Sequence, residues 1–134
     1  MVFDTHPCGC YGEAAFRHFL TVERERAARS NCSFFLLKVS IRSNSGRYTD
    51  FAPATAARLW PLLWASVRDV DFVGWYRDGK IAAAVLTQGA GSPVDQAQSV
   101  LVQRVAQTLH ERLSGSVDGS LQVRVIHVHP KARR

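Results

Sequence analysis

The chain has 134 residues, of which 46% are hydrophobic and 21% charged, and its formal net charge is +6. These values exclude a disordered chain, a collagen and a coiled-coil rod, and the length fits one domain of about 100–200 residues. No apolar run approaches the ~18 residues of a membrane span, and residues 1–10 lack a signal-peptide pattern. We therefore expect a cytoplasmic protein without a membrane span.

The first half of the chain predicts a leader, a helix and a strand. Residues 1–12 contain two glycines and a proline and should form an irregular leader. Residues 13–30 carry apolar side chains at helical spacing and predict a helix. Residues 33–41 (SFFLLKVSI) predict a strand, and their apolar first half on both faces favours the centre of a sheet. The strand turns polar at Lys38 and Ser40, near its C-terminal end.

The second half alternates between helical and strand patterns. The predicted elements are a loop at 42–52, a helix at 53–67, a hairpin at 71–87, a helix at 92–114 and a strand at 121–128. The hairpin is the clearest signal, because Asp78 and Gly79 stand between two apolar runs and favour a tight type I′ turn. Ser92 and Pro93 are typical of a helix start.

The predicted order, α-β-α-β-β-α-β, contains the βαββαβ unit of ferredoxin-like folds. We therefore expect an α+β domain at residues 13–130, with a leading helix, an antiparallel four-stranded sheet and a basic tail at 131–134. Right-handed crossovers place the 33–41 strand at the centre of the sheet, beside the strand that begins at Ile81.

The cysteine and charge patterns limit which cofactors and partners we expect. Cys8, Cys10 and Cys32 are an odd number without a secretion signal, which argues against a disulfide framework. The N-terminal pair with His6 offers three ligands at most, whereas structural zinc takes four, so we expect no metal and no cofactor. Cys32 is expected in the core. The basic residues are scattered, which does not favour nucleic-acid binding.

Four stretches of the chain carry a family resemblance. They are FLTVERERAAR at 19–29, SFFLL at 33–37, VDFVG at 70–74 and IAAAVL at 81–86. In that order they resemble the leading helix, the first strand, the approach to the hairpin and the following strand of the GGDEF diguanylate cyclase domain. The resemblance covers roughly residues 13–130 and implies a GGDEF-like, nucleotide cyclase-like fold. It also implies a reaction that uses two magnesium ions, which take oxygen ligands, usually carboxylates.

At the positions where the resemblance implies a metal and nucleotide site, the residue types differ. The degenerate positions are Lys38 and Ser40 at the end of the first strand and Arg77, Asp78, Gly79 and Lys80 in place of the signature sequence. An ammonium group cannot ligate a cation, because it has no lone pair. The sequence therefore predicts a pseudoenzyme: a degenerate, non-catalytic domain that serves bacterial signalling as a regulatory or protein-interaction module.

Two alternatives stay open at this point. A metal-independent nucleotide or cyclic-dinucleotide sensor would hold phosphates through Lys38, Arg77 and Lys80, with Asn44 as a further ligand-binding residue. Arg68 and Asp71 have the spacing of the family's inhibitory motif, in a displaced register. An RNA-binding ferredoxin-like module would stack bases on aromatic residues of its central strands, and residues 81–87 contain none. The expected partner is another protein or a second copy of the chain, bound through exposed Trp75 and Tyr76 near the hairpin turn.

Overall fold

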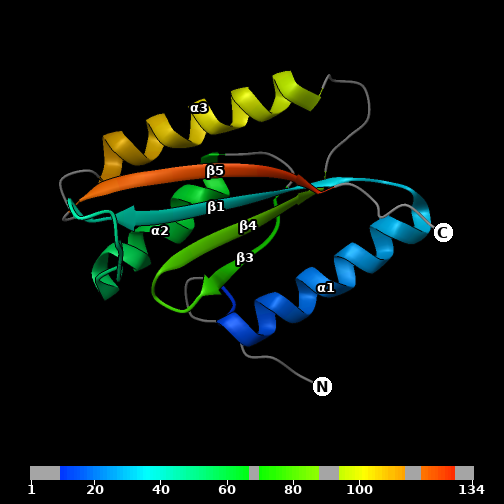
Figure 1. The fold of residues 1–134 in the computed structure, drawn as a ribbon, viewed down its shortest axis with the longest axis horizontal. Coiled ribbons are helices and arrows are strands. Elements are labelled where there is room, and N and C mark those ends of the chain that lie inside the picture. Colours follow the sequence, from blue (N-terminus) through cyan, green and yellow to red (C-terminus); the bar gives the residue numbers. More distant parts are fainter. Residues whose placement is uncertain (1–9, 67–69, 88–93, 114–118, 129–134) are drawn as a thin grey trace.

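The computed structural model describes residues 10–66, 70–87, 94–113 and 119–128, which form an antiparallel sheet with helices on both faces (Figure 1). In chain order the elements are α1 (Glu13–Ser30), β1 (Phe34–Arg42), β2 (Tyr48–Thr49), α2 (Pro53–Ser66), β3 (Val70–Arg77), β4 (Ile81–Thr87), α3 (Val94–Leu113) and β5 (Ser120–Val128). This order confirms the predicted α+β class with its leading helix. The short strand β2 is an addition, inside the predicted 42–52 loop.

Strand β1 lies at the centre of the sheet. It pairs antiparallel with β4 along one edge and with β5 along the other. Strand β3 pairs with β4, so the four long strands are ordered β5-β1-β4-β3, as the ferredoxin-like prediction requires. Since β5 pairs with β1 along its whole length, the short β2 must use the same edge of β1 as β4 does, beyond the end of β4.

The two faces of the sheet are covered to different extents. On one face, Leu37 and Val39 of β1 pack with buried residues of α2 and α3, among them Leu59 and Leu109. On the other face, α1 covers only part of the sheet, where its Phe16 and Leu20 pack on Phe34, Leu36 and Val85. Side chains alternate along a strand, so the β1 positions that follow Leu36 on this face are Lys38, Ser40 and Arg42. They are half-buried, and the sheet is open there.

Part of the predicted leader belongs to the folded domain. Cys10 is 1% exposed, and Tyr11 forms a parallel bridge with Gly74 of β3. The Tyr11 N–H donates to the carbonyl of Val73 at 3.0 Å, and its own carbonyl accepts from the N–H of Trp75 at 2.9 Å. This differs from the predicted irregular leader, because the outer edge of β3 offers backbone hydrogen bonds that the segment satisfies.

The structure also corrects the position of Cys32, which is exposed and not in the core. Helix α1 ends at Ser30, and the left-handed backbone of the next residue, Asn31 (φ 54°), turns the chain before β1 begins. Cys8, Arg68, the predicted helix start at Ser92 and the basic tail at 131–134 lie outside the described residues. Of the helices that are described, none has the length and apolarity to cross a membrane.

The close approach of Tyr11 to β3 predicts that Gly74→Ala is destabilising. A Cβ at this position would lie 2.6 Å from the Tyr11 carbonyl oxygen and 2.9 Å from Cδ1 of Phe16. Overpacking of this kind costs about 1–3 kcal/mol of unfolding free energy, which urea denaturation followed by tryptophan fluorescence would measure. Gly12→Ala is the control, since its Cβ meets nothing within 4 Å. Equal effects of the two substitutions would contradict the prediction.

Candidate functional site

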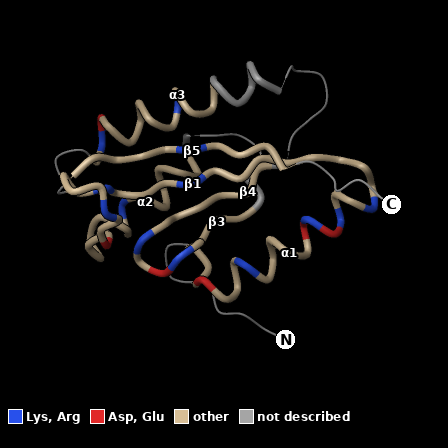
Figure 2. The backbone as a smooth tube through the Cα atoms, viewed as in Figure 1, with Lys and Arg blue, Asp and Glu red and all other residues tan. Residues whose placement is uncertain are grey.

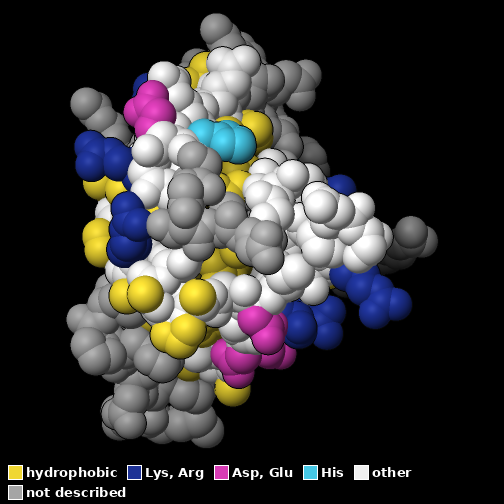
Figure 3. All heavy atoms as spheres, turned by 90° about the vertical axis from the view of Figure 1, so that its left-hand side faces the viewer, with side chains coloured by type: hydrophobic (Ala, Val, Ile, Leu, Met, Phe, Trp, Pro, Cys, Tyr) yellow, Lys and Arg dark blue, Asp and Glu magenta, His cyan; other side chains and the backbone are white. Residues whose placement is uncertain are grey.

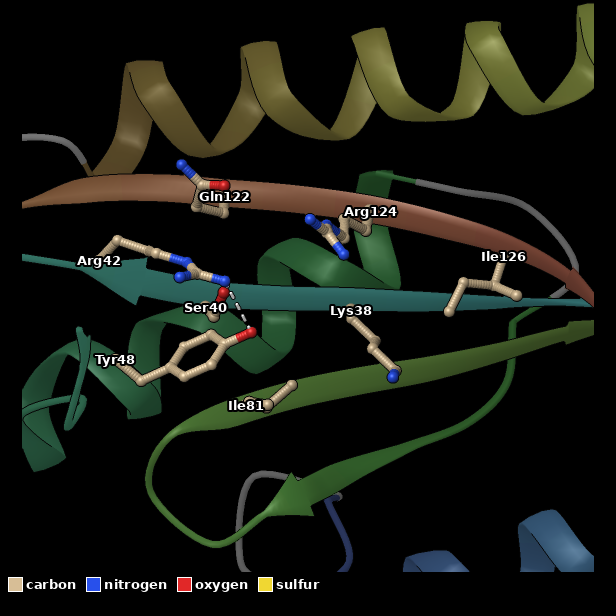
Figure 4. A pocket seen from close by; sticks show the side chains of 8 residues that line it. All are labelled: Lys38, Ser40, Arg42, Tyr48, Ile81, Gln122, Arg124 and Ile126. Carbon is tan, nitrogen blue, oxygen red and sulfur yellow. Dashed lines mark hydrogen bonds between the residues drawn. The ribbon is translucent and has the colours of Figure 1, made fainter. Parts of the chain in front are cut away.

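A small cavity lies on the open part of the sheet, between β1, β5 and the start of β4 (Figure 4). It holds about 70 Å³. Its lining residues are Lys38, Ser40, Arg42, Tyr48, Ile81, Gln122, Arg124 and Ile126. Strand register builds the site, because Lys38 pairs directly with Arg124 and Ser40 with Gln122 across β1 and β5. Figure 2 shows the basic residues of these two neighbouring strands side by side.

The cavity is cationic, with three basic residues and no acidic residue in its lining. Lys38 Nζ lies 4.0 Å from the centre of the Tyr76 ring. The Arg42 guanidinium donates to the Gly46 carbonyl at 2.9 Å and to the Tyr48 hydroxyl at 3.0 Å. Lys38 and Arg42 are therefore held in place by neutral groups that leave their charge uncompensated.

Arg124 differs from the other two cations of the cavity. Within the described ranges, its guanidinium has no hydrogen-bond or ion-pair partner, and the residue is exposed. Its cross-strand neighbour is Lys38, and like charges directly opposite one another destabilise a sheet. The positive charge of this face is thus not balanced from within.

The cavity does not fit a magnesium ion. Mg²⁺ takes oxygen ligands in octahedral geometry. Lys38 offers only donors, and Ser40 offers one hydroxyl. Across the residues that the structure describes, no group of three or more His, Cys, Asp or Glu side chains could hold a metal ion. The chemistry available on this face is the binding of anions.

The hairpin turn has the predicted place but not the predicted type. The Lys80 N–H donates to the Arg77 carbonyl at 3.0 Å, and Gly79 has a φ of 74°. A type I′ turn needs positive φ at both central residues, and Asp78 is not among the described residues with positive φ. A single positive φ at the second central residue is the pattern of a type II turn.

Asp78 connects the turn to the start of α1. The Glu13 N–H donates to Asp78 Oδ1 at 3.0 Å, and the Asp78 N–H donates to Glu13 Oε1 at 2.8 Å. The residue before the helix, Gly12, has no side chain to cap it, so Asp78 supplies from the hairpin the cap that the local sequence lacks. The one acidic side chain of the turn is committed to this contact.

The structure does not bring the four predicted ligand-binding residues together. Of Lys38, Asn44, Arg77 and Lys80, only Lys38 lines the cavity. Lys80 forms an ion pair with Asp50 at 2.9 Å, and Arg77 is exposed on the turn. Asn44 lies in the loop after β1, beside a separate depression lined also by Ser43, Ser45, Thr49 and Gly119.

Two residues that join Lys38 in the cavity, Arg42 and Arg124, were not predicted from the sequence. Arg42 and Arg124 lie on the same face because side chains on a strand alternate and because β5 pairs in register with β1. The alternation of Lys38, Ser40 and Arg42 was visible in the sequence. The register of β5 was not.

The predicted aromatic interaction surface is wrong for Trp75. This residue is 9% exposed and packs against Trp60 and Phe51, with ring centroids 4.9 and 5.6 Å away. Its place on β3 points it to the face that α2 covers. Tyr76 points the other way and is half-buried, with the Arg17 guanidinium 4.5 Å from its ring centre.

The contact between Asp78 and α1 predicts that Asp78→Ala lowers the free energy of unfolding by about 1 kcal/mol, the usual cost of losing a helix cap. Asp78→Asn should lose less, because it keeps an acceptor oxygen. Arg77→Ala, on the same turn, is the control and should stay within about 0.5 kcal/mol. Chemical denaturation measures all three, and a neutral Asp78→Ala would show that the contact does not stabilise the fold.

Lys38 of β1 and Arg124 of β5 carry like charges directly across the strand pair. We therefore predict that Arg124→Gln stabilises the protein at low salt. Relief of one cross-strand like-charge pair contributes about 0.2–1 kcal/mol, and the gain should shrink at 1 M salt, where the Debye length is about 3 Å. Arg104→Gln removes the same charge from the exposed side of α3 and is the control. Thermal denaturation at two salt concentrations measures the effect, and a salt-independent loss of stability would contradict it.

Comparison with known proteins places this architecture. No protein-family model matches the sequence, and no curated protein matches it. Among solved structures, the FimX GGDEF domain from Pseudomonas aeruginosa is 16% identical, with a TM-score of 0.69 over 99% of this chain and 85% of that one.

Two further structures from the same organism are similar. The diguanylate cyclase SiaD, in complex with its activator SiaC, is 17% identical with a TM-score of 0.62, over 92% of this chain and 48% of that one. The GGDEF domain of YfiN (TpbB) is 16% identical with a TM-score of 0.62, over 92% of this chain and 75% of that one. At these identities the likeness is one of fold, and the chain has the fold of a GGDEF domain.

Proposed function

We propose that this chain is a non-catalytic GGDEF-like domain that acts as a regulatory or protein-interaction module in the cytoplasm of a bacterium. One observation carries the proposal. Lys38 and Ser40 stand on the central strand at the positions where the family resemblance implies metal-binding carboxylates. Both side chains line the open cavity, so their chemistry is the chemistry that a ligand would meet there.

Electrostatics support the loss of cyclase activity. Two-metal chemistry needs cations that stabilise the attacking and leaving oxygens of the nucleotide. Lys38, Arg42 and Arg124 repel a divalent cation from this face. At the hairpin, Asp78 is bonded to the start of α1 and does not line the cavity.

A protein partner is supported by the solved neighbours more than by an apolar patch on this chain. SiaD has been solved in complex with its activator, so a chain of this fold can be controlled through a bound protein. The exposed large apolar side chains of the described residues are Val22, Tyr48, Trp64, Val100 and Ile126, on five different elements. Scattered apolar residues of this kind do not define a partner surface.

An RNA-binding role receives no support. RNA-recognition domains stack bases on aromatic residues of the central strands, whereas the β4 residues Ile81 and Ala83, on the same face of the sheet as Lys38, are aliphatic and buried. Figure 3 shows the end of the molecule that carries α2, where basic side chains form small separate groups among acidic and apolar ones. The side chains described at this end form no continuous basic stripe of the kind that a nucleic-acid footprint has.

The proposal predicts that the purified chain makes no cyclic diguanylate from GTP with Mg²⁺ or Mn²⁺, under conditions in which an active cyclase does. The double variant Lys38→Asp/Ser40→Asp should gain affinity for Mn²⁺ by at least about tenfold, about 1.4 kcal/mol, because two carboxylates replace an ammonium and a hydroxyl. Chromatographic product analysis and calorimetry measure these two quantities.

A matched control separates local ligation from net charge. Gln103→Asp/Arg104→Asp makes the same change of three charge units on the exposed side of α3. It should leave Mn²⁺ affinity unchanged. Turnover by the wild-type chain would refute the proposal, and equal Mn²⁺ affinities of the two double variants would refute its electrostatic basis.

A further inference from the structure

The cavity between β1 and β5 has the composition of an anion site. Lys38, Arg42 and Arg124 bring ammonium and guanidinium groups to it, and Ser40 and Gln122 add a hydroxyl and an amide. We propose that this cavity binds a phosphate group of a small phosphorylated molecule without a metal ion. Charge-assisted hydrogen bonds from guanidinium and ammonium groups are the strong contacts of phosphate recognition.

Strand pairing places the three cations around the same small cavity. Lys38 and Arg42 are four residues apart on β1, about 13 Å at 3.3 Å per residue, and Arg124 lies directly across from Lys38. Figure 4 shows Ser40 between them, with Lys38 extending toward β4 and Arg124 lying between β5 and β1. The three cations therefore line the cavity on both sides of Ser40 along β1 and from the neighbouring strand β5.

The polar groups of the cavity also favour an anion. Among the described residues, Arg124 has no partner for its guanidinium, and Ser40 and Gln122 have none for their side-chain polar atoms. Lys38 and Arg124 repel one another across the strand pair. A phosphate would satisfy these donors and convert the repulsion into two attractions.

Size decides how much of the ligand the site encloses. The cavity of about 70 Å³ is far below the roughly 300–1,000 Å³ that encloses a drug-sized ligand. One phosphate group fits these dimensions, and the rest of the molecule would lie outside. Among the described residues, the two aromatic rings beside the cavity already face cations: the Arg42 guanidinium lies 4.2 Å from the centre of the Tyr48 ring, and Lys38 Nζ lies 4.0 Å from that of Tyr76. A small phosphorylated molecule is therefore favoured over single-stranded RNA.

This inference deepens the proposed function and rests on it in one respect: Lys38 acts as a phosphate ligand in place of a metal site. It departs from the ligand set expected from sequence, because Arg77 and Lys80 take no part. The proposed function and the phosphate site can be refuted independently of one another. Cyclase turnover would refute the proposed function, whereas the phosphate site is tested with the metal removed.

The experiment is isothermal titration calorimetry of the full chain with inorganic triphosphate, at low salt and with EDTA present. Wild type should bind. Arg124→Gln should weaken binding at least tenfold, and Lys38→Met should do the same. Arg104→Gln on α3 and Lys80→Met on the turn are controls for net charge and for the ligand set expected from sequence, and both should bind within twofold of wild type.

The stability of the Arg124→Gln variant distinguishes a lost binding site from an unfolded protein. Arg124→Gln is expected to be more stable than wild type at low salt, so loss of binding in this variant cannot be ascribed to unfolding. Four outcomes would overturn the proposal: no triphosphate binding by wild type, unchanged binding by Arg124→Gln, sulfate bound as tightly as triphosphate, or an RNA oligonucleotide bound through Arg124 more tightly than triphosphate. Loss of binding in Lys80→Met equal to that in Arg124→Gln would overturn the assignment to this cavity.

Discussion

The pairing of β1 along both of its edges is the constraint on which the rest of the molecule depends. Residues 34–40 pair with β4 on one side and with β5 on the other, so the backbone of this strand is fully used and only its side chains can vary. One face of β1 stays apolar throughout and is buried by α2 and α3. The other face of β1 changes from Phe34 and Leu36 to Lys38 and Ser40. Helix α1 packs on the apolar pair and does not cover the polar one.

The same constraint explains why charged side chains on the open half of the sheet are compatible with this architecture. Polar residues on the open half of a sheet contribute little to its core, so Lys38 and Arg124 can occupy it at a modest electrostatic cost. At the hairpin, the polar side chain of Asp78 likewise serves a structural contact, with the start of α1. The family resemblance implies catalytic residues near Lys38 and near Asp78. In this structure Lys38 brings a positive charge to the sheet, and Asp78 caps a helix.

Local patterns predicted most of the fold. The apolar runs of β1 and β4, the turn at Asp78-Gly79 and the helical stripe of α1 each follow from neighbouring residues, and the order of elements then restricts the sheet to few topologies. The wrong predictions concern residues whose surroundings come from distant parts of the sequence. Trp75 was expected at the surface because it is near a turn, but its face on β3 depends on where α2 packs. Cys10 was placed in an irregular leader because the bridge of Tyr11 to β3 spans many residues of sequence. The site shows the same division: Lys38 and Ser40 were found from the strand pattern, whereas Arg124 required the register of β5.

The bridge between Tyr11 and Gly74 has a practical consequence for anyone who trims this chain. Strand β3 forms the margin of the sheet, and a bare margin is a template on which a second molecule can add its own strand. Residues 10–12 occupy part of that template, and Cys10 fills the space beneath it. A version that starts at Glu13 would keep every helix and long strand. It would, however, leave backbone hydrogen-bonding groups of β3 unpaired and a cavity at the place of Cys10. Self-association of such a version would report on truncation and not on biology.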